Sequence, residues 1–154
     1  MMNEFWNEYM KNNAGSDAKK AKSCICFGTS EKDAAAACEK ICAGVKRAAV
    51  YPRKGYRCSL NGTPESGDMN IVIDWKGDAV ALIETTGIRL IKLGEMTEAV
   101  CALEGDCATL EEWNEKQLPS IKAEAEELGI AFDDDMELIV EEFRLVYARN
   151  NATA

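Results

Sequence analysis

The chain contains no histidine. This absence excludes several classes of catalytic mechanism. Ser-His-Asp and Cys-His nucleophilic catalysis, histidine general-base mechanisms and the usual catalytic zinc sites all need an imidazole. Acid–base chemistry in this protein must therefore use Lys, Glu, Asp, Tyr or Cys side chains.

Long apolar segments are also missing. No stretch approaches the roughly 20 apolar residues that a membrane helix needs. The N-terminal segment carries Glu4 and Glu8 among its apolar residues, unlike a signal peptide. We therefore expect a cytoplasmic protein with no membrane association.

Cysteine is abundant, but its seven copies do not form a regular framework. An odd number leaves at least one thiol unpaired, and a chain of 154 residues needs no disulfide scaffold. Cys24-x-Cys26 and Cys38-x3-Cys42 could together imitate a four-thiolate zinc site. The first spacing is shorter than the usual C-x2-C, however, and the second lies inside a predicted helix. We expect no metal and no cofactor.

Positive charge is concentrated in one segment of an acidic chain, whose net charge is -9. Five cations occur within twelve residues, with no acid among them: Lys46, Arg47, Arg53, Lys54 and Arg57. Such clustering indicates a site for a negative or hydrogen-bond-rich ligand, the alternative being a solvated loop. Residues 95–142 instead hold sixteen acids against two lysines, which should repel phosphate backbones. We therefore expect no extensive binding of duplex nucleic acid. A protein-interaction module that uses the acidic surface is an alternative function.

Residue periodicity predicts a mixture of helices and strands. Helices are expected at residues 3–12, from an N-cap at Ser30 to a stop at Gly44, at 95–103, and at 110–128 with an interruption or new start at Pro119. Strands are expected at 24–27, in the first half of 44–57, at 70–75, at 79–86 with 88–93 extending or following it, and at 138–147. The elements do not alternate as βαβ units, which favours an α+β fold or a small barrel with attached helices.

Several short motifs occur in an order typical of one family. They are Gly44-x-Lys46 after a helix, Gly67-Asp68, the hairpin of residues 71–80, Ile83-Glu84-Thr85-Thr86, Thr97-Glu98, Glu104-Gly105-Asp106, Leu110-Glu111-Glu112-Trp113, and Glu141-Glu142-Phe143-x-x-Val146-Tyr147. From about residue 27 to residue 147, this ordered set resembles the ASCH domain, a relative of the PUA fold. The resemblance implies an α+β, PUA-like, small and partly open β-barrel of about five to six strands, flanked by helices and with a cleft. We divide the chain into an N-terminal helix and connecting loop (1–23), an ASCH domain (24–150) and a tail (151–154).

The resemblance also implies a function. Family members are proposed to bind RNA or nucleotides, and one branch removes the acetyl group from acetylcytidine. In that branch a lysine accepts a proton, a threonine three residues later is the nucleophile, and a glutamate donates a proton. The lysine corresponds to Lys46 and the glutamate to Glu104, but the threonine position is Ala49, which has no hydroxyl.

The resemblance therefore favours binding of a nucleotide, a modified nucleoside or a short single-stranded RNA in the cleft. Hydrolysis of nucleoside amides or of RNA by Lys46 and Glu104 is the alternative, with Cys58 and Ser59 as the nearby candidates to replace the missing nucleophile. Arginine forks and aromatic rings are the further ligand-binding candidates, since the former bind phosphate or carbonyl groups and the latter stack on bases. These are Arg47, Tyr51, Arg53, Arg57 and Trp113, with Tyr56 and Trp75 as additional rings.

Overall fold

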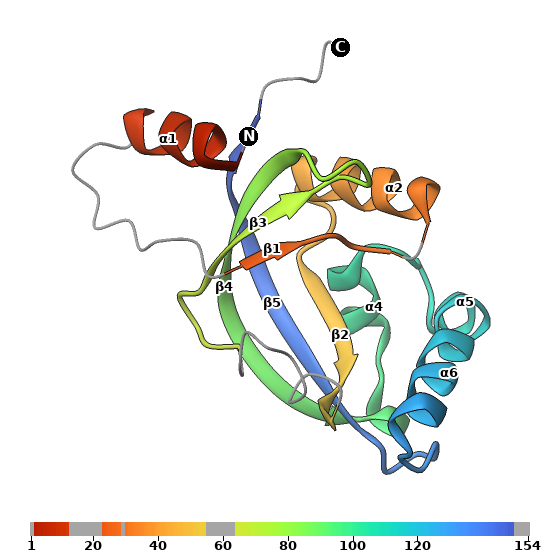
Figure 1. Ribbon diagram of the computed structural model, residues 1–154. Helices are drawn as coiled ribbons and strands as arrows, with labels where there is room; N and C mark the ends of the chain where they lie inside the picture. The colour runs from red at the N-terminus through yellow and green to blue at the C-terminus, as the bar shows by residue number, and fades with distance from the viewer. Residues whose placement is uncertain (1, 13–22, 29, 55–63, 150–154) are drawn as a thin grey trace.

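Five strands form one curled sheet in the order β1-β3-β4-β5-β2 (Figure 1). The computed structural model describes residues 2–12, 23–28, 30–54 and 64–149. The strands are β1 (Ser23–Ile25), β2 (Ala48–Pro52), β3 (Met69–Ile73), β4 (Ala79–Lys92) and β5 (Glu137–Ala148). The helices within the described residues are α1 (Met2–Asn12), α2 (Glu31–Cys42), α4 (Glu98–Glu104), α5 (Leu110–Lys116) and α6 (Leu118–Leu128), with a 3-10 turn η1 (Leu93–Glu95). The predicted α+β, partly open barrel is confirmed as a five-stranded half-barrel.

The length of β4 explains the curl of the sheet. This strand has 14 residues; its first part pairs with β3, and it pairs with β5 along nearly its whole length. Register shifts interrupt the β4–β5 pairing at Leu82/Ile83 and at Thr85/Gly87. Such bulges bend a strand and increase its twist, so one strand can serve both sides of the barrel. Residues 88–93 were expected to extend or to follow the preceding strand, and up to Lys92 they extend it.

Three apolar clusters pack helices onto this sheet. In the first, Trp113 of α5 and Ile121 and Ala125 of α6 contact Ala48 of β2 and Val140 of β5. The second joins α1 to the sheet, and the third joins α2 to it through Ile41, Ala49, Val72, Ala81, Ile83 and Phe143. Helix α2 therefore packs on β4 and β5, whereas α4 and α6 pack on β2.

Capping residues at both ends of α2 determine where the helix begins and ends, and therefore where Lys46 lies. The Ser30 hydroxyl accepts a hydrogen bond from the backbone N–H of Asp33 at 3.1 Å, as the predicted N-cap requires. The helix ends at Cys42, Ala43 is its C-cap, and Gly44 follows with a φ of 75°, in the left-handed region expected for this position. The N–H groups of Val45 and Lys46 then donate to the carbonyl of Lys40, at 2.9 and 3.1 Å. Strand β2 starts at Ala48, so Lys46 and Arg47 precede the strand.

Two predicted helices have different boundaries in the structure. The helix expected at 95–103 begins at Glu98, because the Thr97 hydroxyl caps it by accepting from the N–H of Val100. The segment 110–128 forms two helices, and Pro119 lies in the first turn of the second, where a missing N–H costs nothing. None of the helices in the described part of the chain has the length and apolar character to cross a membrane.

Candidate functional site

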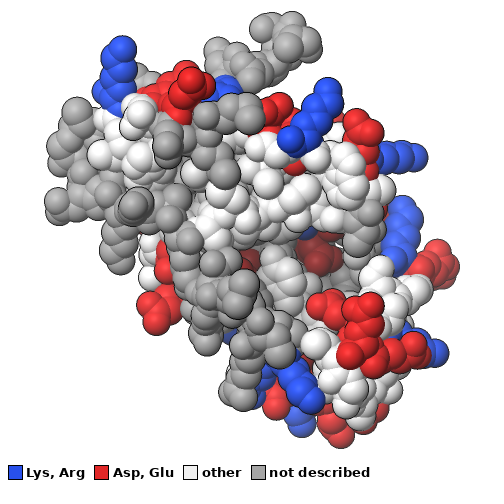
Figure 2. Space-filling model, viewed as in Figure 1, with Lys and Arg blue, Asp and Glu red and all other residues white. Residues whose placement is uncertain are grey.

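A pocket of about 460 Å³ opens between α2, β2 and the segment from α4 to α6. Figure 2 shows the surface hollowed between α2 and the α5–α6 pair, with acidic atoms at the floor. Its lining residues are Phe27, Gly28, Asp33, Ala36, Ala37, Lys40, Lys46, Ala49, Val50, Tyr51, Glu104, Asp106, Lys116, Gln117 and Ser120. A volume of several hundred Å³ suits a small organic ligand.

Lys46 is buried at the floor of this pocket, with 5% of its surface exposed. Its Nζ donates to the backbone carbonyl of Glu104 at 3.0 Å and to Oδ2 of Asp106 at 3.1 Å. The ring of Phe27 lies 5.5 Å from the same Nζ, close enough for a cation–π contact. An ammonium group has three N–H donors, so these two contacts leave one for a ligand.

Glu104 is the second buried ionisable group, 7% exposed. Its Oε1 accepts a hydrogen bond from the indole Nε1 of Trp113 at 2.9 Å. Burial raises the pKa of this carboxyl above its ordinary value of 4.5, and the charge of Asp106 raises it too. The Lys46 charge, the Trp113 bond and a bond from the Val50 backbone oppose this shift without cancelling it. The raised pKa makes the carboxyl easier to protonate. The protonated carboxyl can donate a hydrogen bond, and the ionised carboxylate can only accept one.

Close backbone packing brings Lys46 and Glu104 together although 58 residues separate them. Helix α4 ends at Gly105, whose φ of 80° is left-handed. A Cβ at Gly105 would lie 3.0 Å from the Cα of Lys46, so a side chain there would force the two segments apart. The N–H of Arg47 also donates to the carbonyl of Leu103 at 2.7 Å. The end of α4 is thus docked directly on the chain around Lys46.

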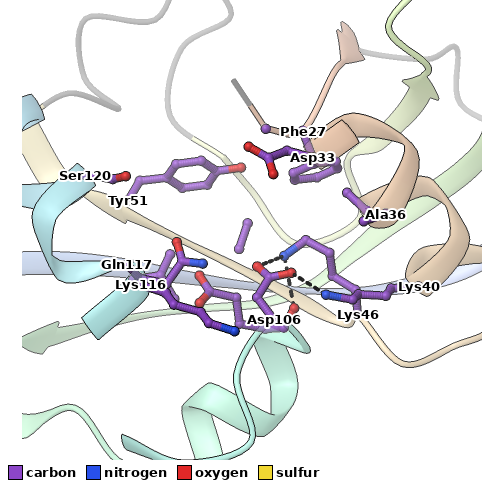
Figure 3. Close-up of a pocket in the computed structure, with 15 residues that line it drawn as sticks. Phe27, Asp33, Ala36, Lys40, Lys46, Tyr51, Asp106, Lys116, Gln117 and Ser120 are labelled. Atoms are coloured by element: carbon purple, nitrogen blue, oxygen red, sulfur yellow. Dashed lines mark hydrogen bonds and ion pairs between the residues drawn. The ribbon is translucent and has the colours of Figure 1, made fainter. Parts of the chain in front are cut away.

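Asp106 and Lys40 belong to the site, although the sequence interpretation did not name them as site residues. Oδ1 of Asp106 lies 3.3 Å from Nζ of Lys40, and its Oδ2 lies 3.1 Å from Nζ of Lys46. Figure 3 shows the carboxylate between the two amines. Glu104-Gly105-Asp106 was visible as a motif, but the partnership of Asp106 with two lysines needs the folded chain. Four more polar lining residues were also missed: Asp33, Lys116, Gln117 and Ser120.

The structure brings only some of the predicted site residues into the pocket. Lys46, Glu104 and Tyr51 line it, and so does Ala49 at the position where a nucleophilic threonine was expected. Arg47 is exposed and is not among the lining residues. Trp113 is 1% exposed and reaches the pocket only through its bond to Glu104, so it offers no free ring face for stacking.

Arg53 lies at a different place, where it forms an ion pair with Glu137. The two residues line a more open hollow together with Lys54, Ile130, Ala131, Asp133, Asp135 and Met136. Trp75 is half exposed and does not line the pocket. The predicted roles of Arg57, Tyr56, Cys58 and Ser59 fall outside the described residues.

The cysteines do not assemble a metal centre in the part of the chain that the structure describes, where no three His, Cys, Asp or Glu side chains are placed to hold a metal ion. Cys24, Cys26 and Cys42 are exposed, and Cys38 is half-buried. Burial, helped by the neighbouring Cys42, raises the pKa of Cys38 to about 11. A thiol with so high a pKa is a poor ligand and a poor nucleophile at neutral pH.

Comparisons with known proteins agree with this architecture. The sequence profile of the ASCH domain matches residues 23–147. The crystal structure of an ASCH domain from Lactobacillus crispatus JV V101 superposes with a TM-score of 0.85 at 28% identity, covering 94% of this chain and 93% of that one. A protein from Enterococcus faecalis V583 superposes with a TM-score of 0.81, covering 98% of this chain and 91% of that one, and at 20% identity it supports the fold alone. No curated protein sequence gives a significant match.

Proposed function

This chain belongs to the ASCH domain family, and from the geometry of its pocket we propose that it binds a nucleobase-containing ligand beside Lys46 and Glu104. The ligand is a nucleoside, a nucleotide or a short single-stranded RNA segment. The observation that carries the proposal is the convergence of a buried amine and a buried carboxyl in one pocket. Burying two ionisable groups is costly, and a fold that only needed stability would gain as much from apolar residues.

The chemistry of the pocket suits the edge of a base. One N–H of Lys46 is available as a donor, and the carboxyl of Glu104 can accept or donate. A base presents carbonyl and N–H groups side by side on its edge, which is the pattern that such a pair complements. Aromatic rings of Phe27 and Tyr51 line the same pocket and offer apolar surface for a planar ring.

Calorimetric titration with nucleosides, nucleoside monophosphates and RNA tetramers tests this proposal. We expect Lys46→Met to weaken binding at least about tenfold, because it removes the buried amine of the pocket without opening a large space. Lys76→Met is the matched control, since Lys76 is exposed in the β3–β4 turn and does not line the pocket. Equal affinities for the parent and Lys46→Met would remove Lys46 from the site. The absence of binding by any of these ligands to the folded parent would contradict the proposal itself.

Hydrolysis of a nucleoside amide or of RNA is a second candidate, favoured by the shared pocket of Lys46 and Glu104. The obstacle is Ala49, which presents a methyl group where the acetylcytidine hydrolases have a hydroxyl. Incubation with acetylcytidine and with single-stranded RNA, followed by chromatography, tests both the parent and Ala49→Thr. Turnover by the parent would establish an enzyme, and turnover by Ala49→Thr alone would identify the missing hydroxyl as the lost component. No products from either protein would leave the binding function.

A further inference from the structure

We propose that Asp106 restricts the pocket to ligands that carry no phosphate where they meet Lys40 and Lys46. The inference rests on the proposed function and narrows its ligand to an uncharged nucleoside. Asp106 would thus be a specificity-determining residue, which favours nucleosides by discriminating against nucleotides.

The Asp106 carboxylate already holds the position between two ammonium groups. Each of its oxygens accepts from a different ammonium, Lys40 at 3.3 Å and Lys46 at 3.1 Å. Two amines arranged around one oxyanion would otherwise make a favourable phosphate site. Because the carboxylate already occupies that position, a phosphate must either displace it or lie beside it, and both arrangements place like charges together.

The positive charges that line the pocket are already balanced by acidic groups. Every lysine that lines it in the described part of the chain has an acidic partner, since Lys116 is held by Glu112 at 2.7 Å. Asp33 and Glu104 add two further acidic side chains to the lining. A phosphate that entered the pocket would therefore lose its hydration without meeting a cation that lacks an acidic partner. An uncharged base edge does not need such a cation.

The backbone on both sides of Asp106 holds this residue in place. It follows Gly105, whose close approach to Lys46 allows no side chain between the two segments. Cys107, the next residue, is 5% exposed and packs in the cluster beneath α5 and α6. With its neighbours on both sides fixed, the carboxylate remains beside the two amines when a ligand enters.

Asp106→Asn tests the inference, because it keeps the shape of the side chain and removes its charge. We expect this variant to bind inorganic phosphate and nucleoside monophosphates at least about tenfold more tightly than the parent. The gain should shrink as salt is added, since salt screens the attraction between a phosphate and the two ammonium groups. Titration with inorganic phosphate alone gives a readout that does not require nucleoside binding.

Two further variants locate the effect. Asp135→Asn makes the same change in charge at an exposed ion pair with Lys92 that lies outside the pocket, and it should give no gain in phosphate affinity. Adding Lys40→Met to Asp106→Asn should abolish the gain, because one of the two amines is then missing. If the double variant binds phosphate as tightly as Asp106→Asn, the proposal that both amines bind the phosphate is wrong.

The parent protein alone provides a test that does not depend on folding of any variant. It should bind a nucleoside at least about tenfold more tightly than the corresponding 5′-monophosphate. Equal or tighter binding of the monophosphate would overturn the inference, and so would a folded Asp106→Asn that gains no affinity for phosphate. If neither nucleoside nor monophosphate binds the parent while Asp106→Asn gains phosphate binding, the role of Asp106 is supported and the proposed nucleoside function is contradicted.

Discussion

Lys46 and Arg53 belong to the same basic segment, residues 46–57, but lie in opposite environments. Lys46, at the first end, is 5% exposed and contacts Glu104 and Asp106 at the floor of the pocket. Arg53, seven residues later, is 35% exposed and pairs with Glu137, itself 48% exposed. The sequence presents both as cations on an acidic protein, and the fold makes one a buried, multiply bonded group and the other a solvated one.

This difference in burial indicates which of the two cations matters more for function. A buried charge is retained only with partners that compensate its lost hydration, so its surroundings are specified closely. An exposed ion pair contributes about 0 to 1 kcal/mol and is screened by salt. Variants of Lys46 and of Arg53 should therefore differ in their effect on stability as well as on ligand binding.

Lys46→Met should show the largest effect on stability. It leaves the carbonyl of Glu104 without its donor and Asp106 with one amine in place of two. Breaking a buried pair costs about 3 to 5 kcal/mol, and the partial exposure of Asp106 lowers the expected loss to about 2 kcal/mol. Urea unfolding of the variant and the parent measures the difference. A loss below about 0.5 kcal/mol would mean that these contacts add no more than an exposed pair does.

Trp113→Phe should have the next largest effect. The substitution removes the indole N–H that Glu104 Oε1 accepts, and it leaves a small void in the cluster beneath α5 and α6. We expect a loss of about 1 to 2 kcal/mol from an unsatisfied buried acceptor and weaker packing. The pKa of Glu104 should rise further, because the lost hydrogen bond favours the ionised form. Carboxyl-region NMR titration measures that shift, and a lower pKa would contradict the assignment of this bond.

Glu104→Gln should change how stability depends on pH. The pKa of Glu104 in the folded protein lies above 4.5, so the folded state holds its proton more strongly than the unfolded state does. The resulting stabilisation is complete below about pH 4.5 and is lost as pH rises through the folded pKa. Glutamine does not titrate, so the variant should gain stability relative to the parent as pH increases. Urea unfolding at several pH values measures the trend, and a difference independent of pH would contradict the raised pKa.

Arg53→Met should have the smallest effect. The loss should stay below about 1 kcal/mol, because both partners of the Arg53–Glu137 pair are substantially exposed. Nucleoside binding should remain within about twofold of the parent, since Arg53 does not line the pocket of Lys46. A loss of binding comparable to that of Lys46→Met would move the ligand site to the Arg53 hollow.

Much of the fold could be predicted because local chemistry determines it. Ser30 and Gly44 mark the ends of α2 by side-chain capping and a left-handed backbone, both of which depend on single residues. Pro119 marked the restart between α5 and α6 for the same kind of reason. The extension of β4 past Gly87 could not be settled in advance, because a glycine permits both a break and a bulge.

The candidate site was less predictable because it depends on contacts between distant segments. Lys46 and Glu104 were identified through the ordered family motifs, and the structure places both in one pocket. Lys40 and Asp106 were missed because no local pattern pairs a lysine of one helix with an acid 66 residues away. Trp113 was expected to offer a ring to the ligand, but the packing of α5 and α6 onto the sheet buries it.

The most direct test of a ligand site at Lys46 and Glu104 is a two-dimensional amide NMR titration of the protein with an unphosphorylated nucleoside. The account predicts shifts concentrated in residues that line the pocket, including Ala49, Val50 and Gln117, and their loss in Lys46→Met. Shifts concentrated around Arg53, Lys54 and Ile130, the residues of the other hollow, would contradict it.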